Sequence, residues 1–205
     1  MDKELKIIGI GGLPRSGKDA LAELFMADNF FGVSFGDIVR GFTRKRHSDK
    51  PDPISVANMT ETSNWLRQTR GADVVLQEAL RQFKEAQATG KAYRGLVLWS
   101  IRAPVEVDFI LERGGSLIWL EASPEVRHQR AVESLRQGEL PISLAEFKRQ
   151  EALQWQPQPD PSVPLEAQMD LSYVRSHATH TLANDGDNLE VFLQEGRVLI
   201  KALGA

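Results

Sequence analysis

One segment near the amino terminus, Gly12–Asp19, has residue types and a spacing suited to binding phosphate. It reads GLPRSGKD and matches the P-loop pattern G-x-x-x-x-G-K. Glycine lets the backbone turn sharply, so that several N–H groups converge on an anion. Lys18 adds a compact positive charge for the β- and γ-phosphates of a nucleotide. We therefore predict a nucleotide phosphate site. The residues expected to bind ATP in it are Gly12, Pro14, Arg15, Ser16, Gly17, Lys18, Asp19 and Ala20.

Asp19 stands where this pattern usually has Ser or Thr. A hydroxyl there is a neutral ligand of Mg²⁺, and a carboxylate is a charged oxygen ligand that suits Mg²⁺ as well. Two interpretations stay open at this point. Either Asp19 contacts the metal, or it is a first-turn acid that only favours the helix dipole.

Charged side chains also follow other expected strands. Asp37 and Arg40 follow one short apolar run, and Arg102 follows another, with Glu106 one helical turn further on. In open α/β sheets the crevice at the carboxyl ends of the strands binds ligands. A guanidinium can bond two phosphate oxygens at once, so the two arginines suit an anionic ligand. A solvated helix face or a structural ion pair is the alternative for each.

The elements that must position these residues alternate between strands and helices. The expected strands are residues 5–10, 31–35, 96–99, 117–120 and 179–183. The helical patterns are residues 18–27, 36–40, 63–88 (one or two helices, with Gly71 as a possible break), 104–113, a start at 123–125, 143–155 and 187–203. Apolar runs without polar alternation are typical of a parallel sheet covered on both faces. The sequence therefore predicts an α/β fold with a five-stranded parallel sheet and helices in a layer on each side.

A proline-rich segment, residues 154–168, interrupts the last part of the chain with four prolines. Proline is excluded from helix interiors and central strands, so this segment is expected to be an irregular surface loop. A further strand and helix follow it, so it is not a linker between domains. The sequence predicts one domain, residues 1–205.

The composition of the chain excludes several classes of protein and of chemistry. The chain has 205 residues, a net charge of −3 and no cysteine. These features exclude disulfides and thiolate chemistry, and they do not suggest a nucleic-acid binder that acts through bulk positive charge. No stretch approaches the roughly 20 apolar residues that span a bilayer. We expect a cytoplasmic protein without a nucleic-acid or membrane partner, either a monomer or a homodimer.

The chain resembles the nucleoside and nucleotide monophosphate kinase group of P-loop proteins, the broad family of adenylate kinase and dephospho-coenzyme A kinase. Within that group it is most similar to small uncharacterised archaeal-type nucleotide kinase homologues. The resemblance runs in family order over nearly the whole chain. It is carried by GLPRSGKD at 12–19, SFGDIVR at 34–40, SIRAPVEVDF at 100–109, LEASPEVRHQR at 120–130 and TLANDGDNLEVF at 181–192.

The resemblance implies roles for the charged residues on the acceptor side. Arg40 and Arg102 would grip the phosphate of an acceptor nucleotide, within helices at about residues 36–90. Asp37 and Glu106 would complete the acceptor site. Arg102 would also act in catalysis, together with Lys18.

The resemblance further implies a small helical lid at about residues 127–150, whose arginines close over the transferring phosphoryl group. Arg130 and Arg149 match the lid arginines best, and are expected to be catalytic; Arg127 and Arg136 match less well. After the fifth expected strand, the loop holding Asn184 and Gly186 would contact adenine.

The pair Trp99-Ser100 departs from the family, which usually ends this strand with an Asp that orders Mg²⁺. Ser100 offers only a hydroxyl. We therefore expect Asp19 and Ser100 to be the residues nearest to Mg²⁺, the cofactor that would accompany ATP.

The favoured function is transfer of the γ-phosphoryl group of ATP to a nucleoside or deoxynucleoside monophosphate. One alternative is transfer to a hydroxyl, as in dephospho-coenzyme A kinase, where Asp37 would be the base. Another is a nucleotide-binding module with little catalysis, which the substitutions at Asp19 and Trp99 motivate. Arg40 and Arg102 together favour an anionic acceptor and hence the first function. The partners expected are ATP and a small nucleotide acceptor.

Overall fold

The computed structural model describes residues 5–135, 141–155, 160–186 and 188–204. At its centre lies a parallel sheet in the order β2-β3-β1-β4-β5. The strands are β1 (Lys6–Gly12), β2 (Phe30–Ser34), β3 (Gly95–Ile101), β4 (Ser116–Glu121) and β5 (His180–Ala183). Each of the five expected apolar runs overlaps one of these strands, so the predicted five-stranded parallel sheet is confirmed.

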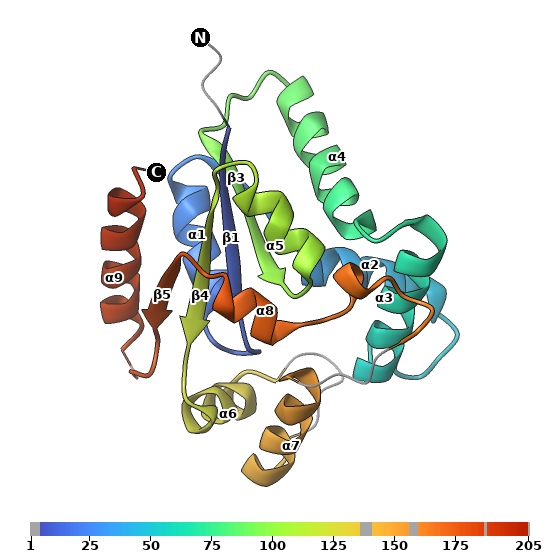
Figure 1. The fold of residues 1–205 in the computed structure, drawn as a ribbon. Helices are drawn as coiled ribbons and strands as arrows, with labels where there is room; N and C mark the ends of the chain where they lie inside the picture. Colours follow the sequence, from blue (N-terminus) through green and yellow to red (C-terminus); the bar gives the residue numbers. More distant parts are fainter. Residues whose placement is uncertain (1–4, 136–140, 156–159, 187, 205) are drawn as a thin grey trace.

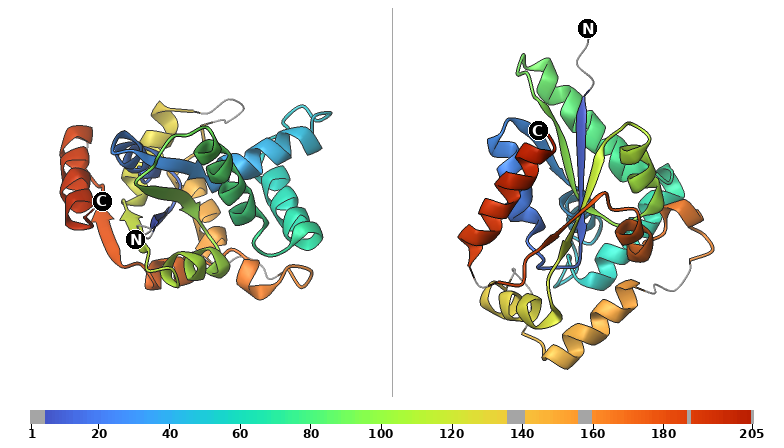
Figure 2. Two further views of the ribbon diagram at one scale, coloured as in Figure 1. Left: turned by 90° about the horizontal axis from the view of Figure 1, so that it is seen from above. Right: turned by 60° about the vertical axis from the view of Figure 1, so that its left-hand side comes forward.

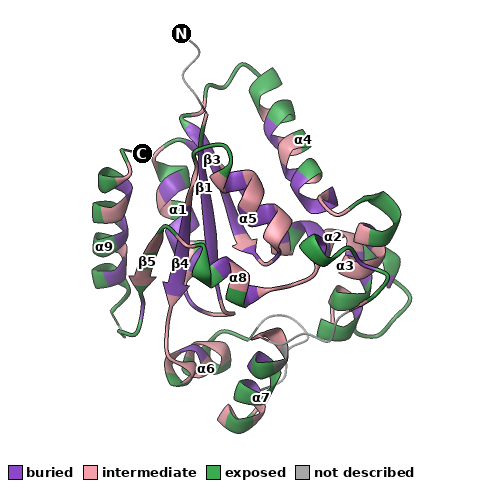
Figure 3. Cartoon of the chain, in the orientation of Figure 1, coloured by how far each residue is buried: buried purple, intermediate pink, exposed green. Residues whose placement is uncertain are grey.

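Helices cover both faces of the sheet and form a three-layer arrangement (Figures 1 and 2). Helices α1 (Lys18–Ala27) and α9 (Leu189–Ala202) cover one face. The other face is covered by α2 (Phe35–Arg46), α4 (Val74–Ala88), α5 (Pro104–Leu111) and α8 (Leu171–Ser176). Alternate residues of β3 belong to opposite layers: Leu96 and Leu98 pack in one buried cluster, and Val97 packs in the other. Strands β1, β3 and β4 are buried along most of their length, as Figure 3 shows, whereas the edge strand β5 has no buried residue.

A bulge interrupts β3 near its carboxyl end. Trp99 pairs with Ile10 of β1, but the next residue of β1 pairs with Ile101. Ser100 is the extra residue, and its φ of 67° lies in the left-handed region. Ile101 consequently rejoins the layer of Leu98, which strict alternation would not allow. Bulges of this kind redirect side chains and are frequent beside active sites.

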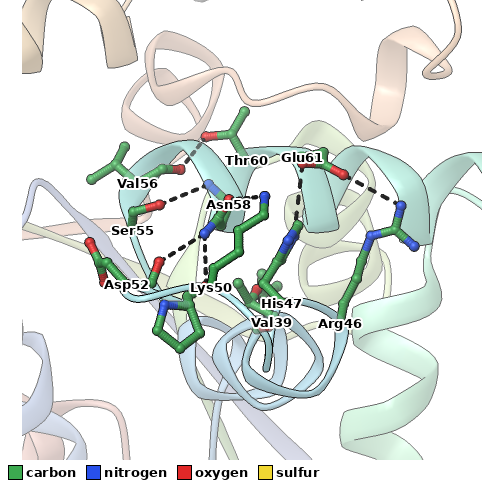
Figure 4. Close-up of polar contacts among 12 residues, drawn as sticks. Val39, Arg46, His47, Lys50, Asp52, Ser55, Val56, Asn58, Thr60 and Glu61 are labelled. Carbon is green, nitrogen blue, oxygen red and sulfur yellow. Dashed lines mark hydrogen bonds and ion pairs between the residues drawn. The ribbon is translucent and has the colours of Figure 1, made fainter.

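Helix α3 (Val56–Arg70) packs against α2, and a polar corner fixes the connection between them (Figure 4). Asn58 is the centre of this corner. Its Nδ2 donates to the carbonyls of Asp52 and Pro53 at 2.9 and 3.1 Å, and its Oδ1 accepts from Lys50 at 2.9 Å. Because these bonds hold the loop to the start of α3, they set where that helix lies relative to α2.

The structure refines several helix boundaries. The pattern expected at residues 63–88 forms two helices, α3 and α4, separated at Gly71, whose φ is 107°. Helix α3 starts earlier than expected because the Ser55 hydroxyl caps it. Asn188 caps α9, and Asp187, the cap expected from the sequence, lies outside the described residues.

The proline-rich segment is more regular than predicted where the structure describes it. It contains a short 3-10 turn, Leu165–Ala167, and α8 follows it directly; the sequence analysis missed both. Residues 156–159 lie outside the described part of the chain.

Two further helices, α6 (Pro124–Glu133) and α7 (Leu144–Trp155), lie beyond the carboxyl ends of the strands (Figure 1). They occupy the region expected to form a lid. Arg136 falls in the undescribed residues between them. Within the described ranges, none of the helices is long and apolar enough to cross a membrane.

Candidate active site

The P-loop joins β1 to α1 and requires glycine at two positions. Gly12 and Gly17 have φ values of 142° and 100°. A Cβ atom on Gly12 would lie 2.7 Å from Ser16 Oγ and 2.8 Å from the carbonyl of Leu120, and one on Gly17 would lie 2.4 Å from the Asn184 amide. The loop can therefore close tightly only without side chains at these two positions.

Two polar side chains of the loop are buried. Lys18 is 8% exposed, and its Nζ donates to the carbonyl of Leu13 at 2.7 Å, so it folds back over the loop. Ser16 is fully buried, and its Oγ has no hydrogen-bond partner among the described residues. A buried hydroxyl without a partner is costly, and a ligand oxygen would satisfy it. With the amino end of α1 beyond it, the loop fits a phosphate group.

A hollow of about 430 Å³ adjoins the P-loop, which is within the size range of small-ligand sites. It brings together four residues that the sequence analysis assigned to ATP binding, although they are far apart in the chain. The residues that line it are Gly17, Ala20, Val126, Gln129, Arg130, Glu133, Asn184, Gly186 and Leu189.

Arg130 forms hydrogen bonds with residues from two other segments around this hollow. Its Nη2 donates to the carbonyl and the Oδ1 of Asn184 at 3.0 and 3.1 Å, and to the carbonyl of Gly186 at 3.0 Å. Its Nη1 lies 3.4 Å from the carbonyl of Arg15. Asn184 in turn donates to the carbonyl of Ser16 at 2.9 Å. Arg130 therefore places a positive charge beside the P-loop and connects α6 to the loop after β5.

The two residues that depart from the family pattern are in direct contact. Trp99 Nε1 donates a hydrogen bond of 2.8 Å to Oδ1 of Asp19. The indole is 8% exposed, whereas Asp19 lies at the surface in the first turn of α1. The carboxylate of the P-loop is thus oriented by the end of β3.

Ser100, the bulge residue of β3, lies beside the start of α2. A Cβ atom on Gly36 would lie 3.6 Å from Ser100 Oγ and 3.7 Å from Ser34 Oγ. The Ser100 hydroxyl is therefore near the carboxyl ends of β2 and β3. Its left-handed backbone is unusual for a residue with a side chain.

We expect Ser100→Gly to raise the free energy of unfolding. A left-handed non-glycine residue costs about 1–2 kcal/mol, and the greater freedom of glycine in the unfolded chain offsets about half of that gain. Urea denaturation should therefore show an increase of about 0.5–1 kcal/mol. Ser176→Gly in α8, where the backbone is helical, should be destabilising; the same stabilisation at both serines would contradict the strain argument.

The acceptor-side residues lie at the carboxyl ends of β2 and β3. Arg40 forms an ion pair with Asp37 one turn earlier in α2, and both side chains are partly or largely exposed. Arg102 Nη1 lies 3.2 Å from Gln154 Oε1 and 3.4 Å from Met169 Sδ. Residues on both sides of the proline-rich segment therefore contact the Arg102 guanidinium.

Glu106 is buried behind this side of the site. Its Oε2 accepts from the backbone N–H groups of Arg102 and Ala103 at 2.7 and 3.2 Å, and its Oε1 lies 3.4 Å from Arg67 Nη2. Burial raises the pKa of the Glu106 carboxyl, and Arg67 and the two N–H groups oppose that rise. Both oxygens are engaged by protein donors, so the structure gives Glu106 a supporting position: it caps α5 and orients Arg67.

Arg67 is the residue of this region that the sequence analysis missed. Its side chain is 10% exposed, and its Nε is buried without a hydrogen-bond partner in the described structure. The one signal in the sequence is that polar residues, Asn58 and Thr62, precede Leu66 at a spacing of four. The structure buries all three, so α3 places polar side chains beside the apolar cluster to which Leu66 belongs.

The expected lid arginines have different positions. Arg127 is 1% exposed and donates to the carbonyl of Ala122 at 2.8 Å and to Glu151 Oε2 at 2.9 Å, so it clamps α6 to α7. Arg149 is 74% exposed on α7 and pairs with Glu146 on its own helix at 2.8 Å. Of the residues expected to be catalytic, Lys18 and Arg130 therefore meet at the P-loop, Arg102 lies at the end of β3, and Arg149 is on the outer surface of the lid.

Comparison with curated proteins finds archaeal relatives. No model of a protein family matches the chain. A UPF0200 protein of Pyrobaculum aerophilum is 26% identical over 200 residues, which cover 96% of this chain and 98% of that protein. A UPF0200 protein of Methanococcus vannielii is 31% identical over 127 residues, or 62% of this chain and 65% of that protein. The expected similarity to small archaeal proteins is confirmed.

Comparison with solved structures supports the fold. TT1252 from Thermus thermophilus has a TM-score of 0.52 and 19% identity, over 98% of this chain and 99% of that one. A shikimate kinase from Bacteroides thetaiotaomicron has a TM-score of 0.53 and 16% identity, over the same shares of 98% and 99%. At this identity the comparison shows the fold alone. The chain has the fold of P-loop kinases, as the resemblance implied.

Proposed function

We propose that the protein is an ATP-dependent phosphotransferase that moves the γ-phosphoryl group of ATP to a nucleoside or deoxynucleoside monophosphate. The observation that supports this proposal is that the P-loop and the arginines assigned to the acceptor follow the carboxyl ends of strands in one parallel sheet. The P-loop, with buried Lys18 and Ser16, adjoins a hollow sized for a nucleoside. Arg40 lies in α2, which follows β2, and Arg102 follows β3 directly.

In this reaction the protein would act through position and charge. A monophosphate acceptor is already an oxyanion, so it needs no strong general base. Lys18 and Arg130 would neutralise charge on the donor phosphates, while Arg40 and Arg102 would hold the acceptor phosphate in line with them.

The donor atoms at the P-loop fit Mg²⁺. Asp19 provides a carboxylate whose Oδ1 is held by Trp99, and Ser100 provides a hydroxyl at the adjacent strand end. Bound Mg²⁺ would neutralise charge shared by the β- and γ-phosphates. Asp19 is the stronger ligand of the two because it is charged.

A second candidate, transfer to a hydroxyl, is favoured by the position of Asp37. Its carboxylate is 65% exposed at the amino end of α2, beside the crevice, and a carboxylate is a suitable general base for a hydroxyl acceptor. Arg40, which pairs with Asp37, favours the first candidate, because a guanidinium suits an anionic acceptor better than a neutral hydroxyl.

A coupled assay of ADP release tests these candidates directly. The protein is incubated with Mg·ATP and, in turn, with each nucleoside and deoxynucleoside monophosphate, with dephospho-coenzyme A and with shikimate. Stimulation by one monophosphate supports the proposal, and stimulation by dephospho-coenzyme A or shikimate supports the second candidate. Tight ATP binding without turnover on any acceptor would contradict both and indicate a binding module.

Arg40→Ala and Arg102→Ala should each raise the KM for the acceptor, or lower kcat/KM, by about ten- to a hundredfold. The loss of a charge-assisted hydrogen bond costs about 1.5–3 kcal/mol, which corresponds to this factor. The affinity for ATP should change much less. Arg44→Ala, an exposed arginine of the same helix, is the matched control and should leave both constants unchanged. If the two variants lose ATP affinity and keep their acceptor KM, the acceptor side has been assigned incorrectly.

A further inference from the structure

The hydrogen bond between Trp99 and Asp19 joins two positions 80 residues apart in the sequence. The indole has a fixed position, because β3 is paired on both sides at Trp99: with Ile10 of β1 and with Ser34 of β2. The neighbouring strand makes room for the ring, since a Cβ atom on Gly32 would lie 3.2 Å from Trp99 Cζ3. The donor N–H is thus held in place by the sheet.

This donor suits a carboxylate that must bind a cation. The indole N–H can donate but cannot accept, so Trp99 fixes one oxygen of Asp19 without offering a competing ligand. Oδ1 receives the hydrogen bond at 2.8 Å, and Oδ2 is the oxygen left for another partner. Asp19 is exposed, in the first turn of α1 and next to Lys18, at the helix end that follows the P-loop.

The negative charge of Asp19 bears on whether a metal ion binds beside the P-loop. A carboxylate in the first turn after a P-loop faces the same phosphates that the loop binds, and like charges at this distance repel. A divalent cation between them converts that repulsion into two attractions, because carboxylate and phosphate oxygens are both preferred ligands of Mg²⁺. A hydroxyl at this position is a neutral ligand of Mg²⁺ and would not repel the phosphates when the metal is absent.

We propose that Asp19 is the carboxylate that holds the nucleotide's Mg²⁺ and that Trp99 is its positioning residue. The carboxylate thus comes from the first turn of α1, and a residue near the carboxyl end of β3 orients it. This inference rests on the proposed function insofar as it requires a nucleotide in the P-loop. It makes nucleotide binding itself metal-dependent, which is a property that can be measured without turnover.

Titration calorimetry with ADP, in EDTA and in excess Mg²⁺, tests this inference. Mg²⁺ should tighten ADP binding to the unmodified protein by about tenfold or more, equivalent to at least about 1.4 kcal/mol. Asp19→Asn keeps the shape and an oxygen for the indole but removes the charge, so it should bind ADP better in EDTA and lose most of the Mg²⁺ effect. Asp19→Ser should also bind ADP better in EDTA, but it should keep part of the Mg²⁺ effect, because its hydroxyl is a neutral ligand of Mg²⁺.

Trp99→Phe keeps an aromatic ring and removes only the N–H donor. It should reduce the Mg²⁺ effect to a value between those of the unmodified protein and Asp19→Asn. In the double variant, Trp99→Phe should add nothing to Asp19→Asn, because the two residues act as one unit. Trp119→Phe, a buried tryptophan of β4 that packs against Trp155, is the matched control and should leave the Mg²⁺ effect intact.

The outcomes separate the inference from the proposed function. Equal Mg²⁺ effects in the unmodified protein and both Asp19 variants would overturn the role of Asp19. A Trp99→Phe variant that unfolds at a lower temperature but keeps the full Mg²⁺ effect would reduce Trp99 to a structural residue. Failure of the unmodified protein to bind ADP, even with Mg²⁺, would instead refute the nucleotide site on which the proposed function depends.

Discussion

The Lys18→Ala variant should lose ATP-dependent turnover by about 10²–10³-fold or more, the size of effect seen when one preorganised charge-stabilising donor is removed. Lys18 is 8% exposed, and its ammonium group donates to the carbonyl of Leu13 at 2.7 Å. Its side chain belongs to neither apolar cluster, so the fold should tolerate the change. Steady-state kinetics and circular dichroism of the same preparation check both parts.

Lys84→Ala, at an exposed position of α4, is the control for loss of a lysine and should keep full turnover. A Lys18→Ala protein with normal secondary structure and normal turnover would refute the assignment of this loop as the ATP site.

The second large effect concerns stability of the α6–α7 pair. Arg127 and Glu151 are 2% and 8% exposed at their side chains and form an ion pair with two contacts. Removing one member of a buried pair leaves the other charged and without a partner, which costs about 3–5 kcal/mol. Arg127→Ala should therefore unfold, wholly or in this helix pair, at much lower urea than the unmodified protein.

Two further variants distinguish the pair from a phosphate-binding role. Arg127→Met combined with Glu151→Leu replaces both charges by apolar side chains and should recover most of the lost stability. Arg149→Ala, on the exposed face of the same helix pair, should change stability little. If the double variant is as unstable as Arg127→Ala, the ion pair is not what holds α6 to α7.

The sheet was predictable because its signal is local. Continuous apolar runs such as 96–99 are long enough to mark a strand covered on both faces. The break at Gly71 and the hydroxyl of Ser143, which accepts from the backbone N–H of Glu146 at 3.2 Å, were visible for the same reason. Helix α8 was missed because it has six residues and follows a proline-rich segment, which leaves no full period of apolar residues to detect.

The candidate site was predictable only in part. The P-loop is contiguous in sequence, so its residue types and spacing could be read directly. The partnership of Trp99 with Asp19 depends on the way β3 passes beside β1, and no local pattern encodes it. The sequence did not indicate Arg67 either, because its ion-pair partner, the buried Glu106, lies on another helix. Arg149 matched by position in the chain, but helix α7 presents it to solvent.

The end of α7 and the residues that follow it contact Arg102 and helix α3. Asp160 Oδ2 accepts from Asn64 of α3 at 2.9 Å, and Gln154, at the end of α7, contacts Arg102. Only residues 156–159 separate Trp155 from Asp160, and that length of chain spans at most roughly 18 Å. A displacement of α7 would therefore act on the Arg102 guanidinium through Gln154, and the chain limits how far α7 can move from the residues bonded to α3.

If the protein binds two substrates as proposed, this short connection would link their binding thermodynamically. If a nucleotide in the P-loop draws α6 and α7 inward, the cost or gain of moving α3 appears in the affinity for the acceptor. Linkage requires the acceptor to change the affinity for ATP by the same factor. Synergy between substrates is then a consequence of chain length, and lengthening the connection would weaken it without altering any residue that touches either ligand.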